Sequence, residues 1–289
     1  MKLLIDAGNT RVKLGWLDAQ GRREPTPEAI PHAELEHRLR IWLQALHAPV
    51  TAAVGVSVAS ADIARTIERL VHQAGAVQVR WLQAEPATAG LVNGYARPGQ
   101  LGADRWLALV GLQAQGRPRP APGGEAGNSS GSEHRDMLRA PVIMLASLGT
   151  ATTVDTISPE GVFEGGLILP GYDLMLTSLA RGTANLPLAR GALRPFPTNT
   201  DDAIASGVAA AQAGAIVRQL MEVRQRWAGH EAVLYLTGGA APRVKPALDR
   251  LMTHAGLTLP VHFVDNPVLN GLAVVAAGKL ADATAADPP

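Results

Sequence analysis

The chain has 289 residues and no cysteine. Disulfide bonds, thiolate metal sites and thiol nucleophiles are therefore excluded together. Aromatic residues make up only 4% of the chain, and 26 basic against 25 acidic residues leave a net charge of +1. With neither a basic face nor interleaved aromatic residues, we expect no nucleic-acid partner.

Long apolar runs are missing as well. No uninterrupted apolar segment approaches the ~20 residues that span a bilayer. Asp6 also comes too early for a secretory signal peptide. We therefore expect no membrane partner and a cytoplasmic enzyme. The histidines show no metal-ligand spacing, and neither a Walker loop nor a G-x-G-x-x-G fingerprint occurs.

The chain does contain two α/β halves. Apolar strands alternate with helical segments up to about residue 114, which predicts a first domain over residues 1–114. Residues 115–140 are rich in Pro, Gly and Ser and predict a flexible insertion. Alternation then resumes, which predicts a second domain over residues 141–289.

The first residues predict a strand, a polar turn and a second strand. The first strand ends at Asp6, residues 7–10 form the turn, and apolar alternation resumes at Val12. Such a turn exposes backbone N–H groups that can bind phosphate, and Asp6 could hold the Mg²⁺ that accompanies a nucleotide. An ordinary edge hairpin would explain the same pattern.

The pattern returns in the second half. Residues 142–147 predict a strand, residues 148–152 a turn of small residues, and residues 153–157 a second strand. Two halves that begin alike predict an internal duplication with a nucleotide cleft between the domains. Near residue 238 a glycine turn follows another strand. It would let the backbone approach an adenosine closely, although a tight strand-to-helix connection needs the same glycines.

Residues 93–106 form the other candidate site. Asp104 and Arg105 stand at the start of a predicted helix, directly after a glycine and an alanine. Asp104 could be a general base, Arg105 an anion clamp and Tyr95 a wall of the substrate pocket. Alternatively, Asp104 only compensates the helix dipole. Farther along, Thr200 is expected to cap the long helix that follows it.

Together these motifs resemble the type III pantothenate kinases, which belong to the superfamily of acetate and sugar kinases and actin. The ordered motifs are D-x-G-N-T at 6–10, Y-x-x-P-x-x-L-G-x-D-R at 95–105, G-T-A-T-T-x-D at 149–155, G-G-x-I-x-P-G at 165–171 and T-G-G at 237–239. The resemblance implies an α/β fold of two duplicated actin-like, ribonuclease H-like domains. It also implies ATP-dependent phosphorylation of pantothenate, the first step of coenzyme A biosynthesis.

The resemblance further implies roles for individual residues. Asp104 would accept the proton, and Asp6 would lie near Mg²⁺. ATP would be bound by Asp6, Ala7, Gly8, Asn9, Thr10, Arg11, Val12, Lys13 and Thr150. Pantothenate would be bound by Tyr95, Gly102, Ala103, Asp104, Arg105 and Thr200. Members of the family are homodimers, so Thr200 would serve either its own site or that of the partner subunit.

One position departs from the family pattern. Three residues before Thr150, where relatives often carry an aspartate that helps to bind K⁺ or NH₄⁺, this chain has Ser147. A serine hydroxyl can ligate potassium but brings no charge, which leaves the monovalent cation open. Two rival functions also stay open: a kinase of another small hydroxy acid or sugar, and an accessory regulator of gene expression.

Overall fold

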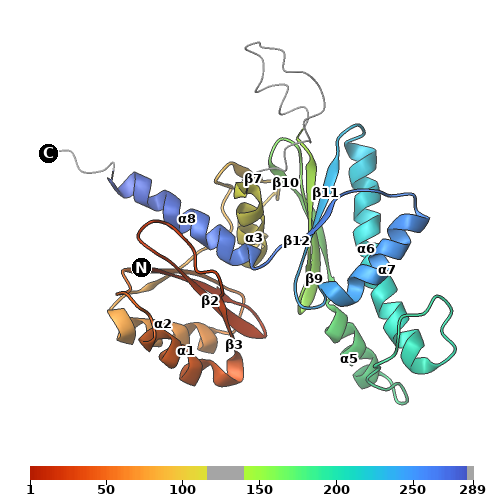
Figure 1. Cartoon of the computed structure of the whole chain (residues 1–289), viewed down its shortest axis with the longest axis horizontal. Helices are drawn as coiled ribbons and strands as arrows, with labels where there is room; N and C mark the ends of the chain where they lie inside the picture. Colours follow the sequence, from red (N-terminus) through yellow and green to blue (C-terminus); the bar gives the residue numbers. More distant parts are fainter. Residues whose placement is uncertain (116–139, 285–289) are drawn as a thin grey trace, which may run out of the picture. The chain divides into compact units, whose positions relative to one another are not determined.

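The computed structural model describes residues 1–115 and 140–284, which form two compact units (Figure 1). The first unit comprises residues 1–115 together with 266–284, and the second comprises residues 140–265. Nearly all of the predicted insertion at 115–140 lies outside the described residues.

The first unit contains a five-stranded sheet in the order β3-β2-β1-β4-β5. Its strands are β1 (Lys2–Ala7), β2 (Arg11–Leu17), β3 (Glu28–Pro31), β4 (Ala52–Ser57) and β5 (Val79–Trp81). β3, β2 and β1 pair antiparallel, whereas β1, β4 and β5 pair parallel. A short hairpin of β6 (Ala87–Thr88) and β7 (Leu91–Asn93) follows.

Helices cover both faces of this sheet (Figure 1). Alternate residues Leu3 and Ile5 of β1 pack in one core with α1 (Leu35–Gln44) and α2 (Ala61–Gly75). The other face is covered by α3 (Ala103–Ala114) and α8 (Pro267–Thr284). Lys2, which points to that face, donates a hydrogen bond to a main-chain carbonyl of α8. Asp6 has the same parity as Lys2, so strand alternation directs it towards the α3 side.

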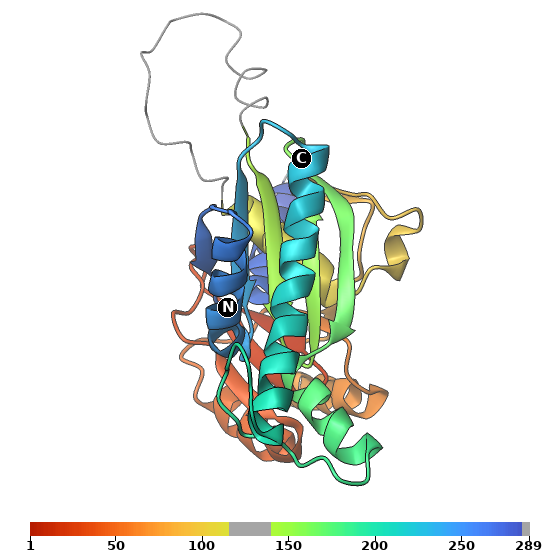
Figure 2. The ribbon, with the colours of Figure 1, turned by 90° about the vertical axis from the view of Figure 1, so that its right-hand side faces the viewer.

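In the second unit the strands lie in the order β12-β11-β8-β9-β10. They are β8 (Val142–Leu148), β9 (Ala151–Ile157), β10 (Val162–Pro170), β11 (Ala232–Thr237) and β12 (Val261–Phe263). The helices are α5 (Tyr172–Gly182), α6 (Thr200–Arg226) and α7 (Ala241–His254). The long α6 runs along the sheet (Figure 2), and its Val208, Ile216 and Leu220 are buried in one core with residues of β8.

The two sheets share one pattern of pairing. In the second unit β10, β9 and β8 pair antiparallel and β8, β11 and β12 parallel, which repeats the order of the first unit. This repeat confirms the predicted α/β fold and its duplication. The sequence analysis missed β3, whose counterpart in the second unit is β10.

The last helix, α8, belongs to the first unit and not to the second, where the sequence analysis placed it. The sequence placed residues 141–289 in one domain, but α8 packs against α3 in the first unit. A Cβ on Gly271 would lie 1.9 Å from the Leu107 carbonyl oxygen, and one on Gly111 would lie 2.4 Å from the Pro267 carbonyl oxygen. The two helices therefore approach closely through glycines. Among the described residues, no helix is long and apolar enough to cross a membrane.

Candidate active site

The first polar turn joins β1 to β2, as the sequence predicts. Asp6 and Lys13 lie opposite each other in the antiparallel register. The turn between them is closed by a hydrogen bond of 3.1 Å from the Gly8 N–H to the Arg11 carbonyl oxygen. Asn9 and Thr10 at its tip are exposed.

Ala7 and Val12 flank this turn with their side chains in the hydrophobic core. Of the predicted nucleotide-binding residues, these two can therefore offer only main-chain groups to a ligand. Arg11 is exposed and Lys13 is half-buried, so both cationic side chains are accessible to an anion.

A histidine that the sequence analysis did not identify supports the turn. His32, just after β3, places its Nε2 atom 2.9 Å from the Gly8 carbonyl oxygen. Since a carbonyl can only accept, the imidazole must carry a proton on Nε2. No local sequence pattern could identify this contact, because His32 lies 24 residues from Gly8 along the chain. The pairing of β3 with β2 brings the two residues together.

The Asp6 carboxylate is in an unfavourable environment for a charge. Its residue is 8% exposed, and burial raises the pKa to about 6 from 3.8. Lys13 lowers this pKa and Asp104 raises it, so the three groups interact electrostatically. No described residue donates a hydrogen bond to the carboxylate. A bound cation would therefore stabilise the ionised form of this buried carboxylate.

The second predicted segment begins α3. Asp104 occupies the first turn of this helix, and its Oδ1 accepts a hydrogen bond of 2.8 Å from the Arg105 N–H. A Cβ on Gly102 would lie 2.8 Å from the same Oδ1 atom. Glycine at this position therefore gives the carboxylate room. Ala103 is buried beside it and anchors the helix start.

Tyr95 and Arg105 lie close together. The Arg105 Nη1 atom lies 3.4 Å from the Tyr95 hydroxyl and donates a hydrogen bond to it. Buried Asn93 shapes the loop between them, accepting the Tyr95 N–H at 3.1 Å and donating to the Pro98 carbonyl oxygen at 3.3 Å. Asn93 is thus a second support that the motif search left without a role.

The second polar turn joins β8 to β9 in the other unit. A hydrogen bond of 3.1 Å from the Gly149 N–H to the Ala151 carbonyl oxygen closes it, and Thr150 is exposed at its tip. Ser147 faces Thr153 across the ladder, as Asp6 faces Lys13 in the first unit. The repeated hairpin therefore lacks the carboxylate of the first.

The second unit also contains Asp155, which ends the 149–155 motif, and the glycine turn near residue 238. Asp155 lies in the middle of β9, fully buried, and Gly166 on β10 leaves room for its carboxylate. Gly238 has φ +94° and would place a Cβ 2.4 Å from the Leu148 carbonyl oxygen, so it serves close packing. A Cβ on Gly239 would meet nothing within 4 Å, which leaves space for a ligand at that residue.

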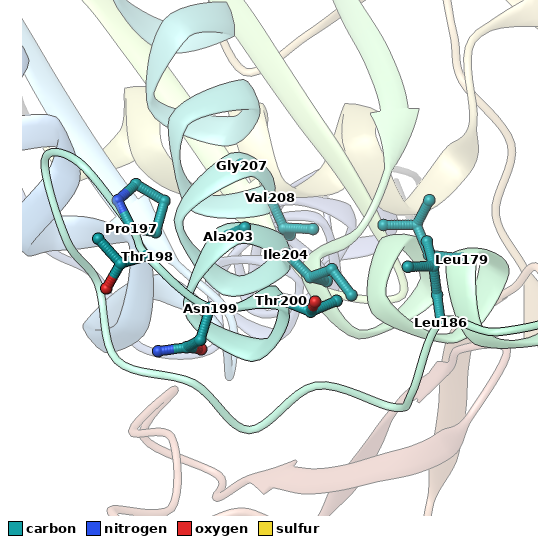
Figure 3. Close-up of a pocket in the computed structure, with 10 residues that line it drawn as sticks. All are labelled: Leu179, Leu186, Pro197, Thr198, Asn199, Thr200, Ala203, Ile204, Gly207 and Val208. Atoms are coloured by element: carbon teal, nitrogen blue, oxygen red, sulfur yellow. The ribbon is translucent and has the colours of Figure 1, made fainter.

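Thr200 does not cap α6, which corrects the sequence-based expectation. Asn199 has extended backbone angles and accepts the Asp202 N–H at 2.9 Å, so Asn199 is the cap and Thr200 is the first helical residue. Thr200 instead lines an open pocket of about 640 Å³ (Figure 3). The lining residues are Leu179, Leu186, Pro197, Thr198, Asn199, Thr200, Ala203, Ile204, Gly207 and Val208.

Within residues 1–115 and 140–284, no three His, Asp or Glu side chains gather in a way that could hold a metal ion. A protein-only metal centre is therefore not built into the described part. A single carboxylate such as Asp6 fits a different arrangement, in which a nucleotide supplies the remaining oxygen ligands.

Comparison with known proteins decides the family. The profile of the type III pantothenate kinases matches residues 2–121 and 133–222. The chain belongs to this family. The type III pantothenate kinase of Bordetella bronchiseptica is 44% identical over 284 residues, covering 96% of this chain and 98% of that protein. The type III pantothenate kinase of Azoarcus sp. is 40% identical over 291 residues, covering 100% and 95%.

Among solved structures, the activator of the 2-hydroxyisocaproyl-CoA dehydratase from Clostridium difficile with bound ADPNP aligns with a TM-score of 0.48. It is 11% identical and covers 100% of this chain and 98% of its own. The type III pantothenate kinase profile leaves residues 122–132 unmatched, and these lie inside the Pro/Gly/Ser-rich insertion.

Proposed function

We propose that the chain transfers the γ-phosphoryl group of Mg·ATP to the terminal hydroxyl of pantothenate, giving 4′-phosphopantothenate for coenzyme A biosynthesis. Family membership supports this reaction. The observation that carries the residue assignment is the buried Asp6 carboxylate, which interacts electrostatically with both Lys13 and Asp104. One unit thus combines a cation ligand, a phosphate counter-ion and a candidate base.

The surroundings of Asp6 fit a divalent cation. Its carboxylate is buried and accepts no hydrogen bond from a described residue, and its raised pKa reflects a charge without adequate solvation. When bound, Mg²⁺ would neutralise charge on the transferring phosphoryl group. Asp6 would bind the Mg²⁺ ion. Lys13 would attract the phosphates and leave the ion in place.

The two polar turns would bind ATP in similar ways. In the first turn, Asn9 and Thr10 offer exposed polar side chains, while the Gly8 N–H closes the turn on the Arg11 carbonyl oxygen. In the second, Thr150 offers an exposed hydroxyl. Such donors position phosphates without proton chemistry, which suits phosphoryl transfer because the reaction depends mainly on positioning and charge.

Asp104 would accept the proton of the pantothenate hydroxyl. Asp104 lies in the first turn of α3, and Gly102 leaves space beside its carboxylate. Arg105 would pair with the pantothenate carboxylate, and its hydrogen bond with Tyr95 fixes its direction. No phosphoenzyme is needed, since acceptor and donor react directly.

We also propose that the chain forms a homodimer in the cytoplasm and that Thr200 binds pantothenate. Thr200 lines an open pocket, and Leu188 and Phe196 in the segment before it are 55% and 90% exposed. Several exposed apolar side chains in one segment fit a surface that a second subunit covers. Light scattering of the purified protein tests the dimer; a monomer at micromolar concentration would contradict it.

The decisive assay combines purified protein, ATP, Mg²⁺ and pantothenate and measures phosphopantothenate by mass spectrometry. Reactions with K⁺, with NH₄⁺ and with neither ion test whether Ser147 is compatible with cation dependence. Glucose and pantoate serve as competing acceptors. Phosphorylation of another acceptor in place of pantothenate, or no product with any cation, would overturn the proposed function.

A further inference from the structure

The second polar turn accepts main-chain hydrogen bonds from the starts of two helices. At one side, the Gly171 N–H, directly before α5, donates a hydrogen bond of 3.0 Å to the Thr150 carbonyl oxygen. At the other side, the Ala240 N–H, directly before α7, donates one of 3.1 Å to the Leu148 carbonyl oxygen. The turn is therefore anchored through its main chain at both ends.

Glycines make both contacts very close. A Cβ on Gly171 would lie 2.1 Å from the Gly149 carbonyl oxygen, and one on Gly238 would lie 2.4 Å from the Leu148 carbonyl oxygen. Backbone lies directly against backbone at these points, with no flexible side chain between. A shift of either helix start would therefore move the turn that carries Thr150.

An ion pair ties the two helix starts to each other. Arg243, in the first turn of α7, donates to both carboxylate oxygens of Asp173, in the first turn of α5, at 2.6 and 2.7 Å. The guanidinium carbon also lies 4.5 Å from the ring centroid of Tyr172, a residue that is only 6% exposed. Bidentate and stacked geometry fixes direction as well as distance.

We propose that Arg243 is a positioning residue for ATP: with Asp173 and Tyr172 it holds α5 and α7 together so that the 148–151 turn is preformed for the nucleotide. This inference rests on the proposed function, because it assigns the turn to ATP. Arg243 itself need not contact the ligand. Its effect passes through Gly171 and Ala240 to the main chain of the turn.

The matched variants are Arg243→Gln and Asp173→Asn, with Lys245→Gln as control. Lys245 also lies on α7 and pairs with Asp249 at 2.7 Å, but both members belong to the same helix. The control thus removes one positive charge and one ion pair without releasing α5. Arg243→Lys keeps the charge and loses the bidentate, stacked geometry.

Two measurements separate positioning from general damage. In the nucleotide-free protein, hydrogen exchange at the amides of Gly171 and Ala240 should be at least threefold faster in Arg243→Gln and Asp173→Asn than in Lys245→Gln. In steady-state kinetics, the KM for ATP should rise about fivefold in Arg243→Gln and in Asp173→Asn. This rise corresponds to a loss of ~1 kcal/mol in binding free energy. The KM for pantothenate and the melting temperature should stay near those of the wild type.

The double variant completes the test. Because both substitutions remove the same pair, Arg243→Gln with Asp173→Asn should raise the KM for ATP no more than either alone. Exchange rates equal to those of Lys245→Gln would overturn the proposal that Arg243 and Asp173 hold α5 and α7 together. This result would count even if the protein proves not to be a kinase. Faster exchange with an unchanged KM for ATP would overturn the link to the nucleotide. Absence of kinase activity in the wild type would instead refute the proposed function.

Discussion

Asp6 and Lys13 face each other across the β1–β2 ladder, yet the lysine does not compensate for the burial of the carboxylate. Burial together with Asp104 outweighs Lys13, and the Asp6 pKa rises to about 6. The fold thus keeps an anionic group in a position where its charge lowers the stability of the ligand-free protein.

Removing this charge should stabilise the ligand-free protein. The folded pKa of about 6 lies above the ordinary 3.8, so the cost is absent below pH 3.8, grows as the pH rises to about 6, and is constant above it. Asp6→Asn should therefore raise the free energy of unfolding by about 3 kcal/mol at pH 8 and by about half of that at pH 5. Urea unfolding without Mg²⁺ or nucleotide measures both values.

Asp18→Asn is the matched control. Hydrogen bonds from the Arg22 main chain, then its side chain, and from the Gln20 main chain lower the Asp18 pKa. This carboxylate contributes stability above its ordinary pKa, so its loss should destabilise at pH 8. Equal stability of wild type and Asp6→Asn at both pH values would contradict the burial argument.

Asp104→Asn should lose most turnover while nucleotide binding persists. The amide keeps the size of the side chain but cannot accept the hydroxyl proton, and loss of a general base costs roughly 10²–10⁴ in rate. Calorimetric titration with Mg·ATP checks that the nucleotide affinity stays within about threefold. A kcat near that of the wild type would leave Asp104 with only its role at the helix start.

His32→Ala should weaken ATP binding and leave pantothenate binding unchanged. It removes the hydrogen bond to the Gly8 carbonyl oxygen, which holds the first turn, and such a bond is worth ~1 kcal/mol. The KM for ATP should rise about fivefold and that for pantothenate should not change. The control is His47→Ala, because His47 packs against Trp16 and not against the turn. Equal rises in both KM values would point to general loosening instead.

Gly271→Ala should destabilise the first unit. Its Cβ would fall 1.9 Å from the Leu107 carbonyl oxygen, so α8 would have to separate from α3, at a cost of about 3 kcal/mol, the upper part of the usual range for overpacking. Gly278→Ala, in the same helix, meets nothing within 4 Å and should stabilise by up to ~1 kcal/mol through helix propensity. Thermal unfolding of both variants tests the pair; similar melting temperatures would contradict the close approach.

Local pattern was sufficient for most elements and for the candidate motifs. Both hairpins and their turns were predictable because strand alternation and turn residues act over a few neighbours. The helix start at Asp104 was predictable for the same reason. The assignment of pantothenate depended on the series of motifs, since no single turn carries information about the acceptor.

Longer-range features needed the folded chain. Four residues carry little apolar pattern, so β3 went unrecognised, and with it the route by which His32 reaches Gly8. The choice between Asn199 and Thr200 as helix cap depended on one pair of backbone angles. Two adjacent polar residues offer equally good capping chemistry to a reader of the sequence.

The sequence by itself therefore determined the α/β duplication, the two polar turns, the Asp104 helix start and the family. Only the tertiary structure decided that α8 packs with the first unit, that burial raises the Asp6 pKa, and that Arg243 joins α5 to α7. The physical reason is range. Propensity, periodicity and turn chemistry act between near neighbours, whereas desolvation, close glycine contacts and ion pairs between helices exist only after distant segments have met.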